Sequence, residues 1–177
     1  MVISFAFSGT LDDAGATRIA TALNGAVNAR YAIAHLAFSS LGGYVAPGIA
    51  LYNHIRALPL KVVAYNVGSV SSIAVAAFVG AEERYCSIHS MFMIHPTAFP
   101  NLQGMTWERL RSVADSALAD DERTESILRE RTRLPDELLQ ARRTRDVHIT
   151  PQEAVTHGLV HGIAEFKVPQ GCQILQI

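Results

Sequence analysis

The alternation of strand and helix patterns in the first two-thirds of the chain restricts the fold more than any other feature. Short runs of β-branched and other apolar residues predict strands over residues 2–7, 32–38, 61–66 and 91–94. Segments between them predict helices over residues 11–29, 45–57 and 71–79. Strands separated by helices in this way need right-handed crossover connections. We therefore expect an α/β protein with a mainly parallel sheet.

The last third of the chain predicts helices of a more polar kind. Residues 105–131 are expected to form a long helix with one apolar stripe, made up of Leu110, Val113, Ala117, Leu118 and Leu128. A short helix is expected over residues 136–142. Thr150, Pro151 and Glu153 follow the order of an N-cap, a first-turn proline and a capping-box glutamate, which predicts another helix start. Residues 163–166 are expected to form a closing strand.

No linker or internal repeat divides the sequence, so a single domain is expected over residues 1–177. A chain of this length can bury roughly 70% of its unfolded surface in one core. We expect the core over about 1–95 and 144–177, with a handle-like helical segment over about 96–143.

The composition argues against several classes of partner. Hydrophobic residues make up 49% of the sequence and charged residues only 18%, which fits tightly packed α/β layers or a buried subunit interface. The formal net charge of −1 gives no attraction to nucleic acid or to an anionic membrane. No nucleic-acid partner and no membrane partner are therefore expected.

Targeting and redox signals favour a cytoplasmic protein. The N-terminus lacks the basic region of a signal peptide, and no apolar run is long enough to span a membrane. Cys86 and Cys172 lie far apart and show no metal-ligand spacing. Reduced thiols are the default expectation for such a pair.

The segment 67–75 is the strongest candidate for chemistry, because it places serines between an expected strand and an expected helix. Ser72 would lie at the helix N-terminus, where unpaired backbone N–H groups can bind an oxyanion. Gly42 and Gly43 follow another strand at the same edge of a parallel sheet, where ligands bind. The local sequence is also compatible with a purely structural role, in which these serines cap the helix or pack in the core. The G-x-S-x-G motif of a nucleophile turn, which would argue against such a role, is absent.

A base and an acid follow later in the chain. His95 ends the strand 91–94 and could accept the serine proton, and Asp146 could fix the tautomer of the imidazole. Each residue also has a structural explanation: most histidines are structural, and Asp146 lies among arginines with which it could form surface ion pairs. A serine hydrolase is the leading hypothesis, and these alternatives stay open.

Metal and nucleotide sites are not predicted. His157 and His161 could face the same side of a helix, but Gly158 between them breaks the helix that would align them as ligands. The segments around Gly42 and Gly68 lack the ending and the spacing of phosphate-binding loops. No metal and no cofactor are expected.

Several segments, taken in order, resemble the Clp protease proteolytic subunit family, whose members are serine peptidases with the ClpP/crotonase fold. The matching segments are Ser39-Ser40-Leu41-Gly42-Gly43-Tyr44-Val45, Gly68-Ser69-Val70-Ser71-Ser72-Ile73-Ala74, Arg84-Tyr85-Cys86, Met93-Ile94-His95-Pro96, Arg145-Asp146 with Ile149-Thr150 and Glu153-Ala154, and His157-Gly158-Leu159-Val160. Their combination is specific, although no single segment is. The resemblance implies repeated β-β-α and βαβ units, a mainly parallel sheet and a long protruding helix in the last third.

The resemblance also implies a site and an activity. Carried over position by position, it makes Ser72 the nucleophile, His95 the general base and Asp146 the third member of a triad. The backbone N–H groups of Gly43 and Ile73 would form the oxyanion hole. The implied activity is that of an endopeptidase, which hydrolyses a peptide or unfolded protein through an acyl-enzyme. A homo-oligomer, such as a heptameric ring or double ring, is implied as well.

The chain departs from the family pattern at several places. Leu41 stands where the family has a proline, and Pro96-Thr97 follows His95 where the family has Gln-Pro. The first expected strand begins at Val2, so the family's N-terminal axial segment, which helps to dock an ATPase ring, has no counterpart. These departures argue against an ATPase chaperone partner and for a peptidase that could work without one. Two alternatives stay open: a catalytically silent subunit with a structural or regulatory role, and a crotonase-like acyl-CoA enzyme.

Overall fold

The computed structural model of the chain describes residues 1–99, 103–168 and 170–177. The strands are β1 (Val2–Ser8), β2 (Ile33–Ser40), β3 (Lys61–Ser71), β4 (Glu83–Cys86), β5 (Met91–Ile94), β6 (Val147–Ile149), β7 (Gly162–Ile163) and β8 (Ile174–Gln176). The helices are α1 (Asp13–Asn28), α2 (Val45–Ala57), α3 (Ile73–Phe78), α4 (Trp107–Arg131), α5 (Asp136–Ala141) and α6 (Pro151–Thr156). The alternation predicted for the first two-thirds of the chain is confirmed.

The strands form one eight-stranded sheet with the order β6-β5-β3-β2-β1-β8. Strand β3 is long enough to have two partners on one side: β4 pairs with its first half and β5 with its last residues. β7 adds to the outer edge of β4. The described pairs are parallel except β5–β6, which is antiparallel. The predicted mainly parallel sheet is therefore confirmed.

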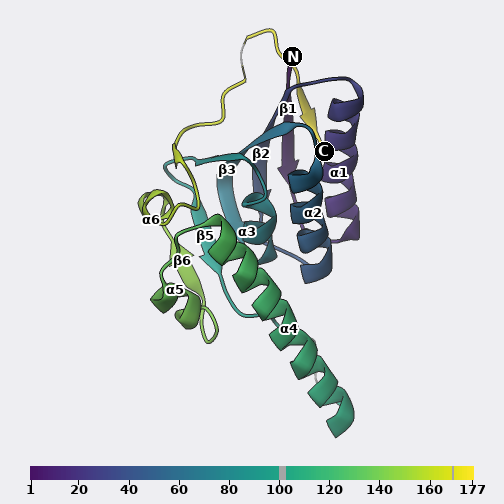
Figure 1. Ribbon diagram of the computed structural model, residues 1–177, viewed down its shortest axis with the longest axis vertical. Helices are drawn as coiled ribbons and strands as arrows, with labels where there is room; N and C mark the ends of the chain where they lie inside the picture. Colours follow the sequence, from purple (N-terminus) through teal and green to yellow (C-terminus); the bar gives the residue numbers. More distant parts are fainter. Residues whose placement is uncertain (100–102, 169) are drawn as a thin grey trace.

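Helices α1, α2 and α3 lie together on one face of the sheet (Figure 1). Helix α1 begins after Asp12, whose side chain accepts a hydrogen bond from the Gly15 N–H. Ile19 and Leu23 face the core, as their spacing predicts, and are fully buried. Every residue of α3 is buried. A short helix fixed in the core therefore follows Ser72 directly.

Helix α4 extends well beyond the body of the domain (Figure 1). Its C-terminal end packs on the core, where Leu128 is 3% exposed, but Leu118 is 63% exposed and Trp107 is 70% exposed. The predicted apolar stripe is therefore wrong at Leu118. The periodicity correctly predicts a helix, but Leu118 faces solvent next to Ala117, which is only 8% exposed, so the buried stripe is narrower than predicted.

The sheet contains more strands than the local patterns predict. β3 continues through Ser71, well beyond its expected end at Asn66, because Ser69–Ser71 pair with β5. β4, β6 and β8 have only three or four residues each, too few for a local pattern to predict a strand, and each forms through pairing with a segment remote in sequence. β7 covers only Gly162–Ile163, instead of the expected residues 163–166.

Local signals outside the sheet are mostly confirmed. Thr150 caps α6, and Glu153 completes the capping box. Between β5 and α4, residues 96–99 and 103–104 form neither helix nor strand, and residues 100–102 lie outside the described part of the chain. Within the described ranges, no helix has the length and apolar character needed to cross a membrane.

Candidate active site

Ser72 lies between β3, which ends at Ser71, and α3, which begins at Ile73. Its backbone has φ 58° and ψ −135°, a region that residues other than glycine rarely occupy. The Ser72 N–H donates to the Met93 carbonyl of β5 at 2.8 Å, and the Ser72 carbonyl accepts from the Val75 N–H at 3.1 Å. Strain of this kind costs about 1–3 kcal/mol and persists where the surrounding structure imposes it, often at functional sites.

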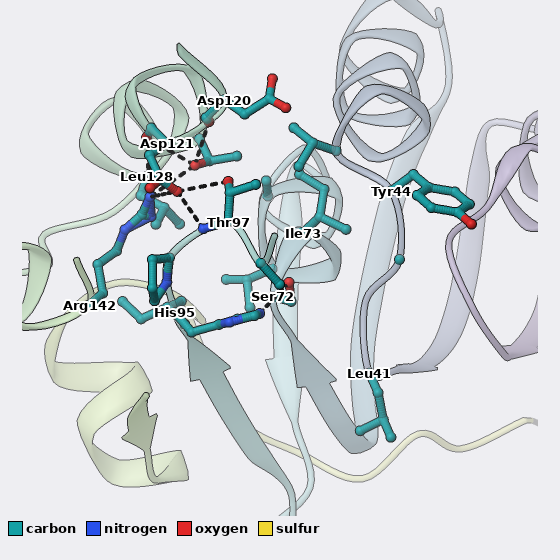
Figure 2. A pocket seen from close by; sticks show the side chains of 18 of the residues that line it. Leu41, Tyr44, Ser72, Ile73, His95, Thr97, Asp120, Asp121, Leu128 and Arg142 are labelled. Carbon is teal, nitrogen blue, oxygen red and sulfur yellow. Dashed lines mark hydrogen bonds and ion pairs between the residues drawn. The ribbon is translucent and has the colours of Figure 1, made fainter. Parts of the chain in front are cut away.

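His95 is brought to Ser72 by the neighbouring strand. It follows β5 directly, and β5 pairs with the last residues of β3. The His95 Nε2 lies 2.7 Å from the Ser72 Oγ, within hydrogen-bond distance (Figure 2). An imidazole in the tautomer that leaves Nε2 unprotonated can accept the hydroxyl proton in this geometry. The two residues that the sequence predicts as nucleophile and base are therefore in contact.

Asp146 does not join this pair in the described conformation. It is exposed, and no hydrogen bond or ion pair within the described ranges connects it with His95. The two backbones are nevertheless neighbours. Ile94 pairs with Val147 in the antiparallel β5–β6 ladder, so the next position along both strands sets His95 opposite Asp146. Opposed residues of a continued ladder have Cβ atoms about 4.5–5.5 Å apart, so contact needs a local rearrangement only.

Gly42 and Gly43 form a loop that packs against both Leu11 and Ser72. The Leu11 N–H donates to the Gly42 carbonyl at 2.9 Å, and the Tyr44 N–H donates to the Leu11 carbonyl at 3.0 Å. Gly42 has φ 107°, and a Cβ atom at this position would stand 2.7 Å from the Ser72 Cβ. Both the backbone angle and the contact with Ser72 therefore require glycine at position 42.

The N–H groups of Gly43 and Ile73 are available to a ligand. The Gly42 carbonyl and the Tyr44 N–H both form hydrogen bonds with the backbone of Leu11. Because backbone polar groups point to alternate sides along an extended segment, the N–H of Gly43 between them points away from Leu11. The Ile73 N–H belongs to the first turn of α3, where no intrahelical acceptor exists. In the described part of the chain, neither N–H has a hydrogen-bond partner. Both residues border the cavity beside Ser72, where such groups can stabilise a negatively charged oxygen.

A cavity of about 630 Å³ opens beside the Ser72–His95 pair (Figure 2). Its volume lies in the range of binding pockets for small ligands, which fits one or a few peptide side chains. Its walls come from the glycine loop, α2, α3, the segment after His95, α4 and the end of α5. The lining residues are Leu41, Gly43, Tyr44, Val45, Ser72, Ile73, Val75, Ala76, Ile94, His95, Pro96, Thr97, Ala98, Phe99, Asp120, Asp121, Thr124, Leu128 and Arg142.

The sequence matches the profile of the family described as Clp protease over residues 6–167. This chain belongs to the Clp protease family. Among curated relatives, the ATP-dependent Clp protease proteolytic subunit of Pinus contorta is 30% identical over 126 residues, which cover 70% of this chain and 61% of the relative. The subunit of the same name from Drimys granadensis is 30% identical over 132 residues, which cover 73% and 65%. The match spans less than two-thirds of the length of these Clp relatives.

A solved structure of the Clp protease family shows the same fold. A ClpP1 mutant from Listeria monocytogenes superposes with a TM-score of 0.81, covering 93% of this chain and 92% of that chain. The two sequences are 20% identical, so this likeness concerns the fold alone. The resemblance inferred from the sequence is confirmed at the level of family and fold.

One cluster at the site of this Clp family member was not predicted from the sequence. Thr97, Asp121 and Arg142 form a polar cluster at the wall of the cavity. They come from three segments more than 20 residues apart in the chain and share no motif. The one local signal was the place of Thr97, two residues after His95.

Proposed function

We propose that the chain is a serine endopeptidase of the Clp protease type, with Ser72 as nucleophile and His95 as general base. The observation that carries this proposal is the 2.7 Å separation between the His95 Nε2 and the Ser72 Oγ. The strained backbone of Ser72 and the unpaired N–H groups of Gly43 and Ile73 support it. A positioned base and preorganised N–H donors are what an acyl-transfer site needs.

The reaction would proceed in two halves. The Ser72 Oγ attacks the carbonyl carbon of the scissile peptide bond while the His95 Nε2 takes the hydroxyl proton. The N–H groups of Gly43 and Ile73 hold the resulting oxyanion. The C–N bond then breaks, and His95 gives its proton to the leaving amine. Water activated by His95 hydrolyses the acyl ester, which releases the carboxylic acid and restores the Ser72 hydroxyl.

Asp146 is proposed as the third member of the triad. Its carboxylate would hold the tautomer of His95 that leaves the Nε2 free, and would stabilise the imidazolium that forms. The register of β5 and β6 supports this assignment, because it sets the two residues opposite each other. Asp146 is exposed in this conformation. We therefore expect full activity only when the pairing of β5 with β6 extends by one residue and brings Asp146 against His95.

Peptides and unfolded proteins are the substrates that the site fits. The Gly43 N–H and carbonyl face away from Leu11 and leave an open edge beside Ser72, where an extended peptide can add as a strand. Leu41 and Tyr44 flank this edge and are 77% and 69% exposed, so they offer apolar contact to a bound chain. The cavity beside Ser72 would take a side chain of the substrate.

We also propose that the protein assembles with copies of itself, as a heptameric ring or a double ring. Exposed apolar side chains on the projecting part of α4, Trp107 and Leu118, support assembly. Sedimentation velocity measures the assembly, and a monomer at micromolar concentration would contradict this proposal. That the protein hydrolyses substrates without an ATPase partner remains a prediction from the sequence, and so does its cytoplasmic location.

One observation favours a second candidate, a catalytically silent subunit that acts as a structural or regulatory partner. Asp146 is exposed and makes no contact with His95 in the described conformation. Without a carboxylate behind the imidazole, triad enzymes lose most of their rate. A subunit that never closes this contact would keep the fold and the assembly while contributing little hydrolysis.

Cleavage of fluorescently labelled casein and short peptides, without ATP or an ATPase, separates the two candidates. If the chain is a peptidase, we expect the wild-type protein to cleave these substrates. The cleavage rate should fall by at least about 10³-fold in Ser72→Ala and in His95→Ala. No cleavage by the protein alone, combined with altered cleavage when it is mixed with an active Clp proteolytic subunit, would favour the silent partner. Undiminished cleavage by Ser72→Ala would exclude Ser72 as the nucleophile.

A further inference from the structure

Asp121, in the second half of α4, accepts two hydrogen bonds from the segment that follows His95. The Thr97 N–H donates to the Asp121 Oδ1 at 2.8 Å, and the Thr97 hydroxyl donates to the same oxygen at 2.9 Å (Figure 2). Only Pro96 separates Thr97 from His95, and the proline ring fixes its own φ near −65°. Holding Thr97 on α4 therefore restricts where the backbone of His95 can lie.

The same residue contacts the segment that leads to Asp146. The Arg142 Nη2 lies 3.4 Å from the Asp121 Oδ1, and donates to the Asp121 carbonyl at 3.1 Å and to the Thr124 hydroxyl at 3.0 Å. Arg142 caps the C-terminus of α5, and the short segment after it ends at Asp146, just before β6. Asp121 therefore touches both segments that present the candidate base and the candidate acid.

The contact between Asp121 and Arg142 is largely shielded from solvent. The Arg142 side chain is 3% exposed and that of Asp121 is 21% exposed. Burial lowers the pKa of the Arg142 guanidinium, while the charges of Asp121 and Glu125 act in the opposite direction. Among the described residues, the Arg142 Nε is buried without a hydrogen-bond partner. Buried ion pairs contribute little net stability compared with apolar replacements, so a geometric role accounts better for this cluster.

We propose that Asp121 is a positioning residue, which holds the segment after His95 and the segment before Asp146 together so that His95 stays aligned with Ser72. This inference rests on the function proposed above. Asp121 acts through Thr97 and Arg142 and does not touch the reacting atoms. Loss of its contacts would let the base move relative to the nucleophile, although both catalytic side chains remain present.

The test compares variants that differ by single hydrogen-bonding groups. Thr97→Val keeps the shape of the side chain and the backbone N–H but removes the hydroxyl donor, whereas Thr97→Ser keeps the donor. Asp121→Asn removes the charge that faces Arg142. Glu122→Gln is the matched control, because Glu122 is exposed at the next position of α4 and forms none of the hydrogen bonds recorded between described residues.

The first measurement is the rate at which a small fluorophosphonate modifies Ser72 in the assembled protein with all 177 residues. We expect the rate to fall by about 10- to 100-fold in Asp121→Asn and about tenfold in Thr97→Val, since misplacement by 1 Å can cost about 10²-fold. Thr97→Ser should regain most of the rate lost in Thr97→Val, and Glu122→Gln should stay within about twofold of the wild type. Peptide hydrolysis should show the loss in kcat, with a smaller change in KM.

The second measurement needs no activity: it is the separation between the Ser72 Oγ and the His95 Nε2 in crystal structures of the same variants. We expect it to exceed hydrogen-bond distance in Asp121→Asn and to stay unchanged in Glu122→Gln. If the wild-type protein does not react with the probe, the proposed function fails, and this separation alone decides whether Asp121 positions His95. Where the wild type reacts, unchanged rates together with an unchanged separation in Asp121→Asn and Thr97→Val would overturn the inference. Where the wild type is unreactive, an unchanged separation in these two variants would by itself overturn it.

Discussion

Gly42 packs directly on Ser72, and a Cβ atom at position 42 would stand 2.7 Å from the Ser72 Cβ. It would also stand 3.1 Å from the Ser71 carbonyl oxygen. The φ of 107° at Gly42 is a conformation that side chains other than hydrogen rarely allow. The loop that carries the Gly43 N–H is therefore placed against the candidate nucleophile through a position with no space for any side chain.

Gly42→Ala should separate the loop from Ser72 and disable the site. We expect the rate of Ser72 modification by a fluorophosphonate to fall by about 10²-fold or more, because the Gly43 N–H would move away from the oxyanion hole proposed above. Gly25→Ala is the matched control: a Cβ atom at Gly25, on the exposed face of α1, would meet nothing within 4 Å. It should keep the wild-type rate and raise stability by about 0.5–1 kcal/mol in thermal unfolding. Equal rates in the two variants would contradict the role of the loop.

Asp146→Asn tests whether the acid reaches His95 during turnover. We expect kcat to fall by about 10²- to 10⁴-fold with little change in KM, because an amide can hold the wrong tautomer of the imidazole. Glu137→Gln, at an exposed position of α5, removes a carboxylate from the same region and should leave kcat unchanged. A wild-type kcat in Asp146→Asn would show that His95 works without this carboxylate.

Glu125 makes the stability of the α4–α5 contact depend on pH. It accepts from the Arg143 Nη2 at 3.0 Å and from the Arg129 Nε at 3.1 Å. Burial alone would raise the pKa of Glu125, but the hydrogen bonds and charges of Arg143 and Arg129 bring it below its ordinary value. A carboxyl group with a lowered pKa in the folded state stabilises the fold above its unfolded pKa of about 4.3, and this contribution is lost as the pH falls through the folded value.

Glu125→Gln should therefore lower the free energy of unfolding by about 1–3 kcal/mol near pH 7, as expected for hydrogen bonds to a charged group. The difference from the wild type should shrink as the pH falls below about 4. Denaturant unfolding at a series of pH values measures both quantities, with Glu122→Gln as the exposed control on the same helix. A difference that is the same at every pH would contradict the assigned ionisation of Glu125.

The elements that the sequence predicts best have local signals at both ends. Helix α2 has the bounds Val45–Ala57, as predicted, because turn glycines precede it and Pro59 follows it. The extension of β3 over Ser69–Ser71 has no such signal, since glycine and serine are poor strand formers. It depends on pairing with β5, and β8 likewise depends on the edge of β1. Tertiary pairing of this kind cannot be predicted from a local pattern.

The candidate site also combines residues that the sequence predicts with geometry that it does not predict. The chain positions of Ser72 and His95 follow from their places at element ends, and the family resemblance selects them from the other serines and histidines. The positive φ of Ser72 has no sequence signal, because the residue is not glycine and the angle is imposed by its neighbours. The contact of Asp121 with Thr97 was not predictable, since it joins two segments that are 24 residues apart and share no motif.

Reaction of the assembled protein with a fluorophosphonate, followed by intact mass, tests Ser72 as the nucleophile most directly. We predict one adduct per chain in the wild-type protein, located on Ser72 by peptide mass spectrometry, and no adduct in Ser72→Ala. An assembled wild-type protein that remains unmodified, or equal modification of the wild type and Ser72→Ala, would contradict the proposal that this chain is a serine peptidase acting through Ser72.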